Sequence, residues 1–248
     1  MFYKKLHEKF WKLVEKNGLG NSIVSVRTRA LKIEEAIGNP DRRDFPLLKG
    51  KEVLMEARFN NAIGQAYTDM PTEFSGTLDQ VVSLEIKSSR DRALYISVLN
   101  AVVRYFYPEV ATIHCKNNEP EECAEEMADS INHKKYRKIG QIGLQPSILE
   151  ALVNKFGEDN LMCADLDEDN KGIIKFGVPI LWGDLENTEE IFKGSDIVLC
   201  TGTTVVNGSI ESMLKLSEKY RIPIIFYGTT IAGTAELMGL ERLCFRSR

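Results

Sequence analysis

The chain has 248 residues, of which 43% are hydrophobic and 27% are charged, and its formal net charge is −4. This composition is typical of a globular protein and excludes a mainly disordered chain. The negative balance gives no basic footprint for nucleic acid, and no apolar run approaches the ~20 residues that span a bilayer. Five scattered cysteines without a Cys-x-x-Cys favour reduced thiols, so we expect a cytoplasmic protein that binds neither nucleic acid nor membrane.

The first part of the chain has the pattern of a small α+β unit. Leu6 and Phe10 fall on one face of an opening helix, and Gly18 suits the end of that helix. Asn60 and Asn61 separate two strand-like runs and fit a tight turn. The predicted elements are this helix, strands over residues 22–30, 52–59 and 62–68, and a long helix over residues 91–107.

From about residue 118 onward, short apolar strands alternate with helices. Strands are predicted over residues 138–142, 161–165, 197–201, 222–227 and, at an edge, 242–245, and helices over residues 118–131, 146–156 and 209–220. This alternation favours a mainly parallel sheet with helices on both faces. We therefore expect an α/β protein in which a small α+β domain, residues 1–112, precedes a Rossmann-like domain, residues 113–248.

The junction after the strand at residues 197–201 has the composition of a ligand-binding loop. In an open parallel sheet, ligands bind outside the carboxyl ends of the strands, near the point where the strand order reverses. Glycines allow close backbone approach, hydroxyls donate hydrogen bonds, and the start of the next helix attracts anions. The candidate residues are Thr201, Gly202, Thr203, Thr204, Asn207 and Gly208. The alternative is that they only cap the helix and close a turn.

Two further strand-to-helix junctions are also candidates. The first contains Gly143, and Asp165 follows about 20 residues later, where a dinucleotide-binding domain keeps its ribose-binding acid. Neither Gly-x-Gly-x-x-Gly nor a P-loop motif is present, so a plain turn is the alternative. The second junction contains Gly228, Thr229 and Thr230. If the strands before these two junctions are neighbours, the two loops face each other across one crevice.

The stretch of residues 196–210 resembles a family of prokaryotic proteins described as "putative heavy-metal chelation" proteins. The resemblance extends over most of the chain, and it includes Leu99-Asn100-Ala101 and the turn at residues 140–147. It implies an enolase-N-terminal-like domain followed by a Rossmann-like domain, with the ligand site where the two meet. It also implies a role in handling a metal ion, or a tetrapyrrole- or pterin-like molecule.

Four residues outside these loops are also candidates. Asn100 lies on an apolar helix face, so it either bonds nearby backbone or points into the crevice and contacts the ligand. Glu56 breaks an apolar strand and is either an outward surface residue or a metal ligand. His114 and Cys115 lie near the domain junction and are either buried structural groups or metal ligands. Adjacent residues of an extended chain point opposite ways, which argues against both binding one ion.

Three functional hypotheses follow from these patterns. The first is binding of a small anionic ligand or metal in the interdomain cleft, with a divalent metal or a metal-complexed small molecule as the expected ligand. The second is a Rossmann-type enzyme with a nucleotide-like cofactor, based on Gly143 and Asp165. The third is a structural module whose loops bind nothing. No Ser/His/Asp or Cys/His motif is present, so no catalytic residue is predicted, and a homodimer is expected as the commonest assembly.

Overall fold

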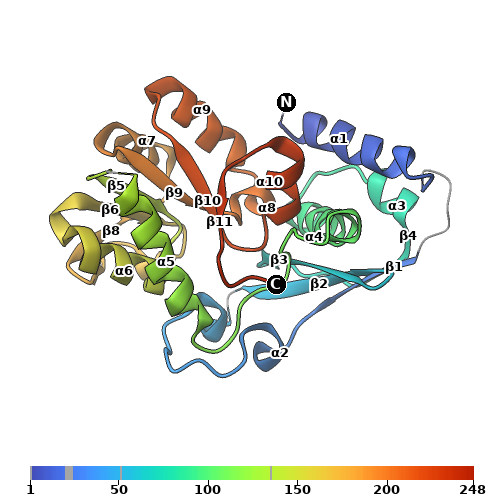
Figure 1. The fold of residues 1–248 in the computed structure, drawn as a ribbon, viewed down its shortest axis with the longest axis horizontal. Helices are drawn as coiled ribbons and strands as arrows, with labels where there is room; N and C mark the ends of the chain where they lie inside the picture. The colour runs from blue at the N-terminus through green and yellow to red at the C-terminus, as the bar shows by residue number, and fades with distance from the viewer. Residues whose placement is uncertain (1, 20–24, 51, 135) are drawn as a thin grey trace.

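The computed structural model describes residues 2–19, 25–50, 52–134 and 136–248, and it contains two sheets with helices packed between them (Figure 1). The strand predicted at residues 22–30 is described from Ser25 onward, and residues 22–24 lie outside the described part of the chain. Within the described ranges, no helix combines the length and the apolar character needed to cross a membrane.

The first sheet has four antiparallel strands in the order β3-β2-β1-β4. The bounds in this region are α1 Phe2–Lys16, β1 Ser25–Ala30, α2 Ile33–Ile37, the short 3-10 helix η1 Pro46–Lys49, β2 Val53–Phe59, β3 Ala62–Thr68, β4 Phe74–Thr77, α3 Leu78–Val82 and α4 Ser89–Phe106. The predicted tight turn joins β2 to β3, because Phe59 pairs with Ala62 and Asn60 adopts a left-handed φ of 52°. β4 was not predicted, since four residues are too few to show an alternating pattern.

The second sheet has seven strands in the order β11-β10-β9-β5-β6-β8-β7, all parallel except that β7 is antiparallel to β8. Its strands and helices are α5 Glu119–His133, β5 Ile139–Ile142, α6 Pro146–Phe156, η2 Glu158–Asn160, β6 Leu161–Asp165, η3 Glu168–Asn170, β7 Ile174–Lys175, β8 Val178–Trp182, α7 Leu185–Gly194, β9 Ile197–Thr201, α8 Thr204–Asn207, α9 Ile210–Tyr220, β10 Ile224–Tyr227, α10 Ala232–Met238 and β11 Arg242–Leu243. The predicted mainly parallel α/β architecture is confirmed. The chain adds β6 and β8 on one side of β5 and then β9 on the other, so the strand order reverses between β5 and β9.

The strand order corrects one expectation about this sheet, and one stretch of the sheet was not predicted. β5 and β10 are not neighbours, because β9 lies between them, so the loop after β9 is the middle one of three consecutive loops. Residues 174–194 form β7, β8 and α7, which were not predicted. Pro179 is exposed in the middle of β8 and interrupts the apolar run that would have indicated a strand.

The helix α4 lies between the two sheets and is buried on every side. All eleven residues from Ala93 to Val103 are buried, whereas a surface helix would bury one face only. A Cβ on Gly64 of β3 would come within 2.1 Å of the backbone nitrogen of Ala101. On the opposite side, a Cβ on Gly233 of α10 would lie 2.8 Å from the Cδ2 atom of Leu99. Glycine at both positions therefore lets α4 pack directly against both parts of the molecule.

A continuous hydrophobic core runs through both parts. Buried side chains of α1, the first sheet and α4 share a cluster with Ile142, Val198 and Phe226 of the second sheet. A second cluster fills the space between the second sheet and the helices α5 and α6. Because the two parts share a core, the boundary between residues 1–112 and 113–248 stays a prediction.

The side-chain amide of Asn100 joins three separate elements at the centre of this core. Asn100 is fully buried on α4, and its Nδ2 donates to the carbonyl oxygens of Gln65 on β3 and Thr230 after β10, at 2.8 and 2.9 Å. Its Oδ1 accepts the N–H of Gly233, at 2.8 Å. The amide therefore satisfies backbone groups from both parts of the chain, as the first of the two sequence-based interpretations requires.

Replacing Asn100 by Ala should lower the free energy of unfolding by about 3 kcal/mol, because three buried backbone groups would lose their partner. Urea unfolding followed by circular dichroism measures this loss. Asn154→Ala, at an exposed position of α6, is the matched control and should change stability by less than about 0.5 kcal/mol. Equal effects of the two substitutions would contradict the assignment.

Candidate functional site

A cleft of about 640 Å³ lies where the carboxyl ends of β5, β6, β9 and β10 face the first part of the chain. Its lining includes the loops after these four strands and, from the first part, the residues Ile37, Phe45, Leu47, Glu52, Tyr67 and Asp69. The cleft contains the reversal of strand order between β5 and β9, which is where open α/β sheets bind ligands.

The loop after β9 brings hydroxyl groups to the cleft. Thr201 and Thr203 both line it, and their Oγ1 atoms lie 3.1 Å apart. Thr204 also lines the cleft, but its hydroxyl donates to the carbonyl oxygen of Thr201 at 2.9 Å and so stabilises the turn. The Oδ1 of Asn207 accepts the N–H and the hydroxyl of Ser209, which closes the turn before α9. Part of this loop therefore caps and closes turns, while Thr201 and Thr203 face the cleft.

The helix that follows this loop differs from the expectation. The long helix α9 begins at Ile210, within one residue of the predicted start, but the four-residue helix α8 lies between the loop and α9. The N-terminus of α9 therefore does not directly follow the threonines of the loop. The hydrogen-bond donors that the loop can present to a ligand are its hydroxyl groups.

The first part of the chain holds this loop in place. Arg92 on α4 donates from Nε to the carbonyl oxygen of Val206 at 2.5 Å, and Tyr3 on α1 donates from its hydroxyl to the carbonyl oxygen of Val205 at 2.9 Å. These carbonyls belong to the last turn of α8, whose acceptors have no partner within so short a helix. The position of the hydroxyl loop therefore depends on α1 and α4.

Gly143 allows the loop after β5 to touch the loop after β9. It has a φ of +86°, and a Cβ there would lie 2.5 Å from the Cγ2 atom of Thr201. The buried Tyr227 of β10 donates its hydroxyl to the carbonyl oxygen of Gly143, at 2.5 Å. The three neighbouring loops are thus interlocked at the reversal point of the sheet.

The carboxylate of Asp165 holds the neighbouring loops together through hydrogen bonds. Its Oδ2 accepts the N–H of Leu144 at 2.6 Å, and its Oδ1 accepts the N–H of Asp167 and the Nδ2 of Asn170, at 2.8 and 3.0 Å. Both oxygens are therefore engaged with the protein, although Asp165 lines the cleft at the end of β6. This carboxylate has a structural role that its spacing from Gly143 did not predict.

An acidic wall forms another part of the cleft lining. It consists of Glu52 and Asp69 from the first part of the chain and Asp165, Asp167, Glu168 and Asp169 from the second. Burial of Glu52, together with the negative charges of Asp165, Asp69 and Asp167, raises the pKa of its carboxyl to about 7. Glu52 is therefore a group that changes charge near neutral pH, at the edge where the two parts meet.

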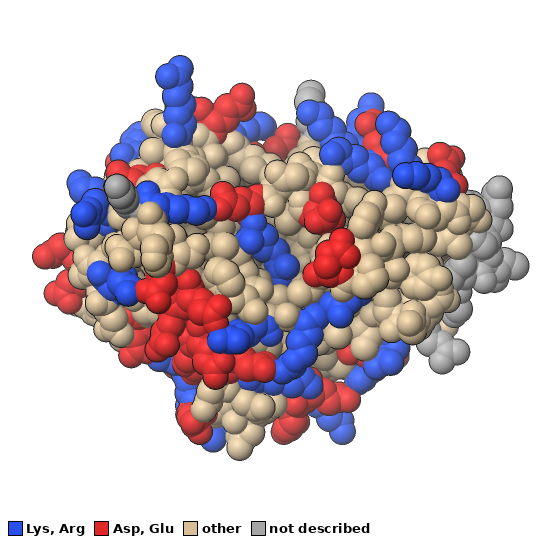
Figure 2. Space-filling model, viewed as in Figure 1, with Lys and Arg blue, Asp and Glu red and all other residues tan. Residues whose placement is uncertain are grey.

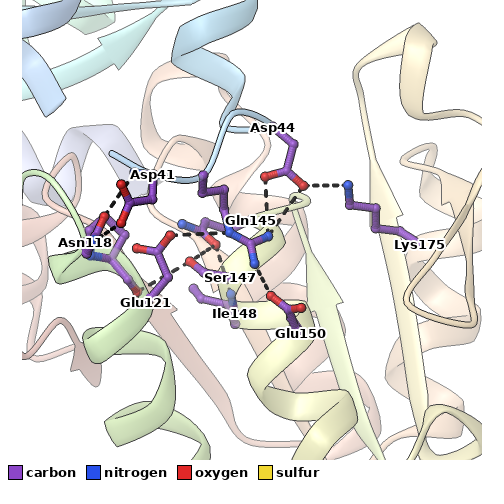
Figure 3. A network of polar contacts seen from close by, with 11 residues as sticks. Asp41, Asp44, Asn118, Glu121, Gln145, Ser147, Ile148, Glu150 and Lys175 are labelled. Atoms are coloured by element: carbon purple, nitrogen blue, oxygen red, sulfur yellow. Dashed lines mark hydrogen bonds and ion pairs between the residues drawn. The ribbon is translucent and has the colours of Figure 1, made fainter. Parts of the chain in front are cut away.

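The front wall of the cleft is a strap of residues 38–50 that carries Phe45 and Leu47 into the lining. Figure 3 shows how polar side chains attach it to α5, α6 and β7. Arg42 on the strap forms ion pairs with Glu121 of α5, at 3.4 Å, and with Glu150 of α6. Asp44 of the strap pairs with Lys175 of β7 at 2.5 Å. The strap is thus attached both by these charged groups and by Phe45 and Leu47, which are buried in an apolar cluster with Leu31 and Leu54.

The structure brings most of the predicted binding residues into this cleft. The predicted residues that line it are Gly143, Thr201, Gly202, Thr203, Thr204, Asn207, Gly228, Thr230 and His114. Those that lie outside its lining are Gly208, Thr229, Asn100, Glu56 and Cys115. Whether the lining residues contact a ligand stays a prediction.

Asn100, Glu56 and Cys115, which lie outside the lining, are buried, and the first two bind other protein groups. Asn100 is occupied by the backbone bonds described above, so it is placed to support the cleft and not to contact a ligand. Glu56 accepts from Arg58 on the same strand at 2.8 and 2.9 Å, in the first sheet and away from the cleft. Cys115 is buried, which raises the pKa of its thiol.

Of the three residues predicted as metal ligands, all of which the structure describes, His114 is the one that lines the cleft. Its Nδ1 is buried with no hydrogen-bond partner, and burial lowers the pKa of its imidazole. Its ring meets the ring of Tyr67 edge to face, with centroids 5.4 Å apart. A neutral imidazole nitrogen is therefore available at the junction of the two parts.

Sequence reasoning missed Glu52, Asp69 and Asp167 as members of the site. Glu52 directly precedes β2 and Asp69 directly follows β3, so the two ends of the hairpin lie side by side. The available signal was that carboxylates flank both outer ends of a predicted hairpin. Their relation to the second sheet could not be deduced without the packing of α4.

Comparisons with known proteins agree with this architecture. Residues 126–238 match the family described as "Putative heavy-metal chelation", DUF364. This part of the chain is similar to the DUF364 family. The resemblance noted at residues 196–210 is thereby confirmed. No curated protein matches the chain.

Two crystal structures of DUF364 proteins of unknown function are similar to the structure of this chain. The one from Pyrococcus horikoshii has a TM-score of 0.57 at 15% identity and covers 96% of this chain and 82% of its own. The one from Desulfitobacterium hafniense has a TM-score of 0.50 at 19% identity and covers 75% of this chain and 73% of its own. At these identities the comparison establishes a shared fold.

Gly143→Ala should destabilise the protein by about 2 kcal/mol more than Gly172→Ala. Both glycines have positive φ, but the new methyl group at residue 143 would collide with Thr201, whereas a Cβ at residue 172 would meet nothing within 4 Å. Thermal and urea unfolding of the two variants measure the difference. Equal destabilisation would show that the loops are not interlocked.

Glu52→Gln should remove a pH dependence of stability between pH 4.5 and 8. Because the folded-state pKa of about 7 exceeds the ordinary value of 4.5, the folded protein keeps a proton that the unfolded chain releases. The wild type should therefore lose stability relative to Glu52→Gln as pH rises through 7, by on the order of 1–3 kcal/mol. Urea unfolding at several pH values tests this, with the exposed Glu236→Gln of α10 as a control that leaves the slope unchanged.

Proposed function

We propose that the cleft binds a small molecule that carries both an anionic group and a metal ion. The observation behind this proposal is that hydroxyl donors after β9 and the carboxylates around Glu52 line one cavity. The hydroxyls can donate hydrogen bonds to an anionic group, and the carboxylates attract a cation. The DUF364 description as a heavy-metal chelation family supports the same conclusion.

The anionic group of the ligand is expected at the loop after β9. The hydroxyls of Thr201 and Thr203 are close enough to share one acceptor. Hydroxyl and backbone donors recognise carboxylate groups such as those on the side chains of tetrapyrroles. The loop therefore supplies orientation without requiring a basic residue.

The metal ion is expected on the acidic side. Within the described ranges, no three His, Cys, Asp or Glu side chains form a set that could hold an ion. These residues do not fit a bare ion held by the protein alone, but they fit an ion that brings ligands from the small molecule. Glu52 would lose its proton when a positive charge enters, because the charge offsets the repulsion from its acidic neighbours.

The nucleotide-enzyme hypothesis has less support from the geometry. Its key residue was Asp165, and both oxygens of that carboxylate are bonded to Leu144, Asp167 and Asn170. A ribose hydroxyl would have to displace one of these bonds. We therefore favour the metal-complex proposal.

The decisive experiment exposes metal-free protein to zinc, nickel, cobalt and copper salts, to a porphyrin and a pterin, and to each metal with each compound. Binding of a complex at 100 times its Kd would raise the stability by about 2.7 kcal/mol, seen as a higher Tm and as a bound mass in native mass spectrometry. Binding should also release a proton near pH 7 in the wild type.

Glu52→Gln should weaken binding of the complex about tenfold and abolish the proton release, because the titrating group is gone. Glu56→Gln is the matched control on the same strand region, and it should leave binding unchanged because Glu56 lies outside the cleft. No binding across the whole panel, or equal effects of the two substitutions, would refute the proposal.

A further inference from the structure

Two of the five cysteines lie against each other, outside the cleft lining. Cys123 is on α5, and Cys244 directly follows β11. The backbone N–H of Phe245 donates to the Sγ of Cys123 at 3.3 Å, which places that sulfur beside the peptide bond after Cys244. The two thiols are close enough that each shifts the pKa of the other.

Ion pairs hold the segment that carries Cys244 against α5. Arg246 pairs with Glu122, at 3.3 Å, and with Glu126, and Arg248 pairs with Glu119. All three acids belong to α5, whose acidic side chains gather on the face shown in Figure 2. The backbone of Arg248 also pairs in both directions with that of Ile113. The contact between the thiols is therefore fixed by several independent interactions.

The surroundings of Cys244 favour its thiolate form. The neighbouring Cys123 thiol lowers the pKa of Cys244, against the effect of burial, and the charge of Arg242 lowers it further. The guanidinium of Arg242 is held by the carbonyl oxygen of Gly228, at 2.8 Å, and by the hydroxyl of Ser247, at 3.1 Å. A cationic group is thus kept beside this cysteine.

The remaining cysteines have the opposite character. The neighbouring Cys244 thiol and burial raise the pKa of Cys123, which makes it the proton donor of the pair. Burial raises the pKa of the thiols of Cys115, Cys163 and Cys200. Cys244 is half-buried, whereas these other cysteines are all buried. A half-buried thiol with a lowered pKa beside a buried thiol with a raised pKa is the arrangement of a nucleophilic and a resolving cysteine.

We propose that Cys244 and Cys123 form a redox-active pair that reduces low-molecular-weight disulfides and is itself converted to an intramolecular disulfide. The Cys244 thiolate attacks one sulfur of the small disulfide, the sulfur–sulfur bond of that molecule breaks, and one small thiolate leaves. Cys123 then loses its proton and attacks the Cys244 sulfur of the mixed disulfide, which releases the second small thiol. The reaction therefore consumes one small disulfide and two protein thiols, and it yields two small thiols and one protein disulfide.

The test treats reduced full-length protein with oxidised glutathione, quenches it with iodoacetamide, and maps the cysteines by peptide mass spectrometry. The expected product is a disulfide that links the peptides of Cys123 and Cys244, with the other three cysteines alkylated after unfolding. Cys123→Ser should stop at a glutathione adduct on Cys244, because the resolving thiol is absent. Cys244→Ser should give no adduct, and Cys163→Ser is the control that should react like the wild type.

A measurement on the unmodified chain keeps the test independent of how the variants fold. In native wild-type protein, iodoacetamide should alkylate Cys244 at least about tenfold faster than Cys115 or Cys163. Equal rates, or a glutathione-induced disulfide that joins any other pair, would overturn the proposal. The outcome is separate from that of the metal-complex proposal, because neither cysteine lines the cleft.

Discussion

The hydrogen bonds of Asn100 are the interaction on which the rest of the structure depends. This one amide connects β3, the turn after β10 and the start of α10, and it lies in the buried, mainly apolar segment Ala93–Val103 of α4. A buried polar group of this kind costs free energy unless it is satisfied, so only one relative placement of the two sheets is compatible with it. The cleft exists because that placement leaves the carboxyl ends of the central strands facing the β2–β3 hairpin.

The composite origin of the cleft explains its unlike walls. The hydroxyl loop is positioned by Arg92 and Tyr3, which belong to the first part of the chain, although the loop itself belongs to the second. Glu52 comes from the first part, and its pKa is raised partly by Asp165 and Asp167 from the second. Each wall owes its observed properties partly to residues of the other part of the chain. The properties of the cleft therefore depend on how α4 packs the two parts together.

The sequence predicted the local features of this protein better than the long-range ones. The turn at Asn60, the glycine and threonine loops and the strand–helix alternation depend on short patterns, and the structure confirms that each lies where it was expected. The placement of β9 between β5 and β10 depends on tertiary packing, as does the engagement of Asp165 with Leu144. Glu52 and Asp167 are 115 positions apart in the chain, so no local pattern could show that their charges interact.

The ion pairs of the strap at residues 38–50 make part of its attachment dependent on ionic strength. Arg42 and Asp44 hold this wall through ion pairs with Glu121, Glu150 and Lys175, several of which are partly exposed to solvent. Dissolved salt screens such pairs over about 8 Å at physiological concentration, whereas it leaves the apolar packing around α4 intact. Concentrated salt therefore weakens the charged contacts of the strap, while the apolar contacts of Phe45 and Leu47 with Leu31 and Leu54 persist.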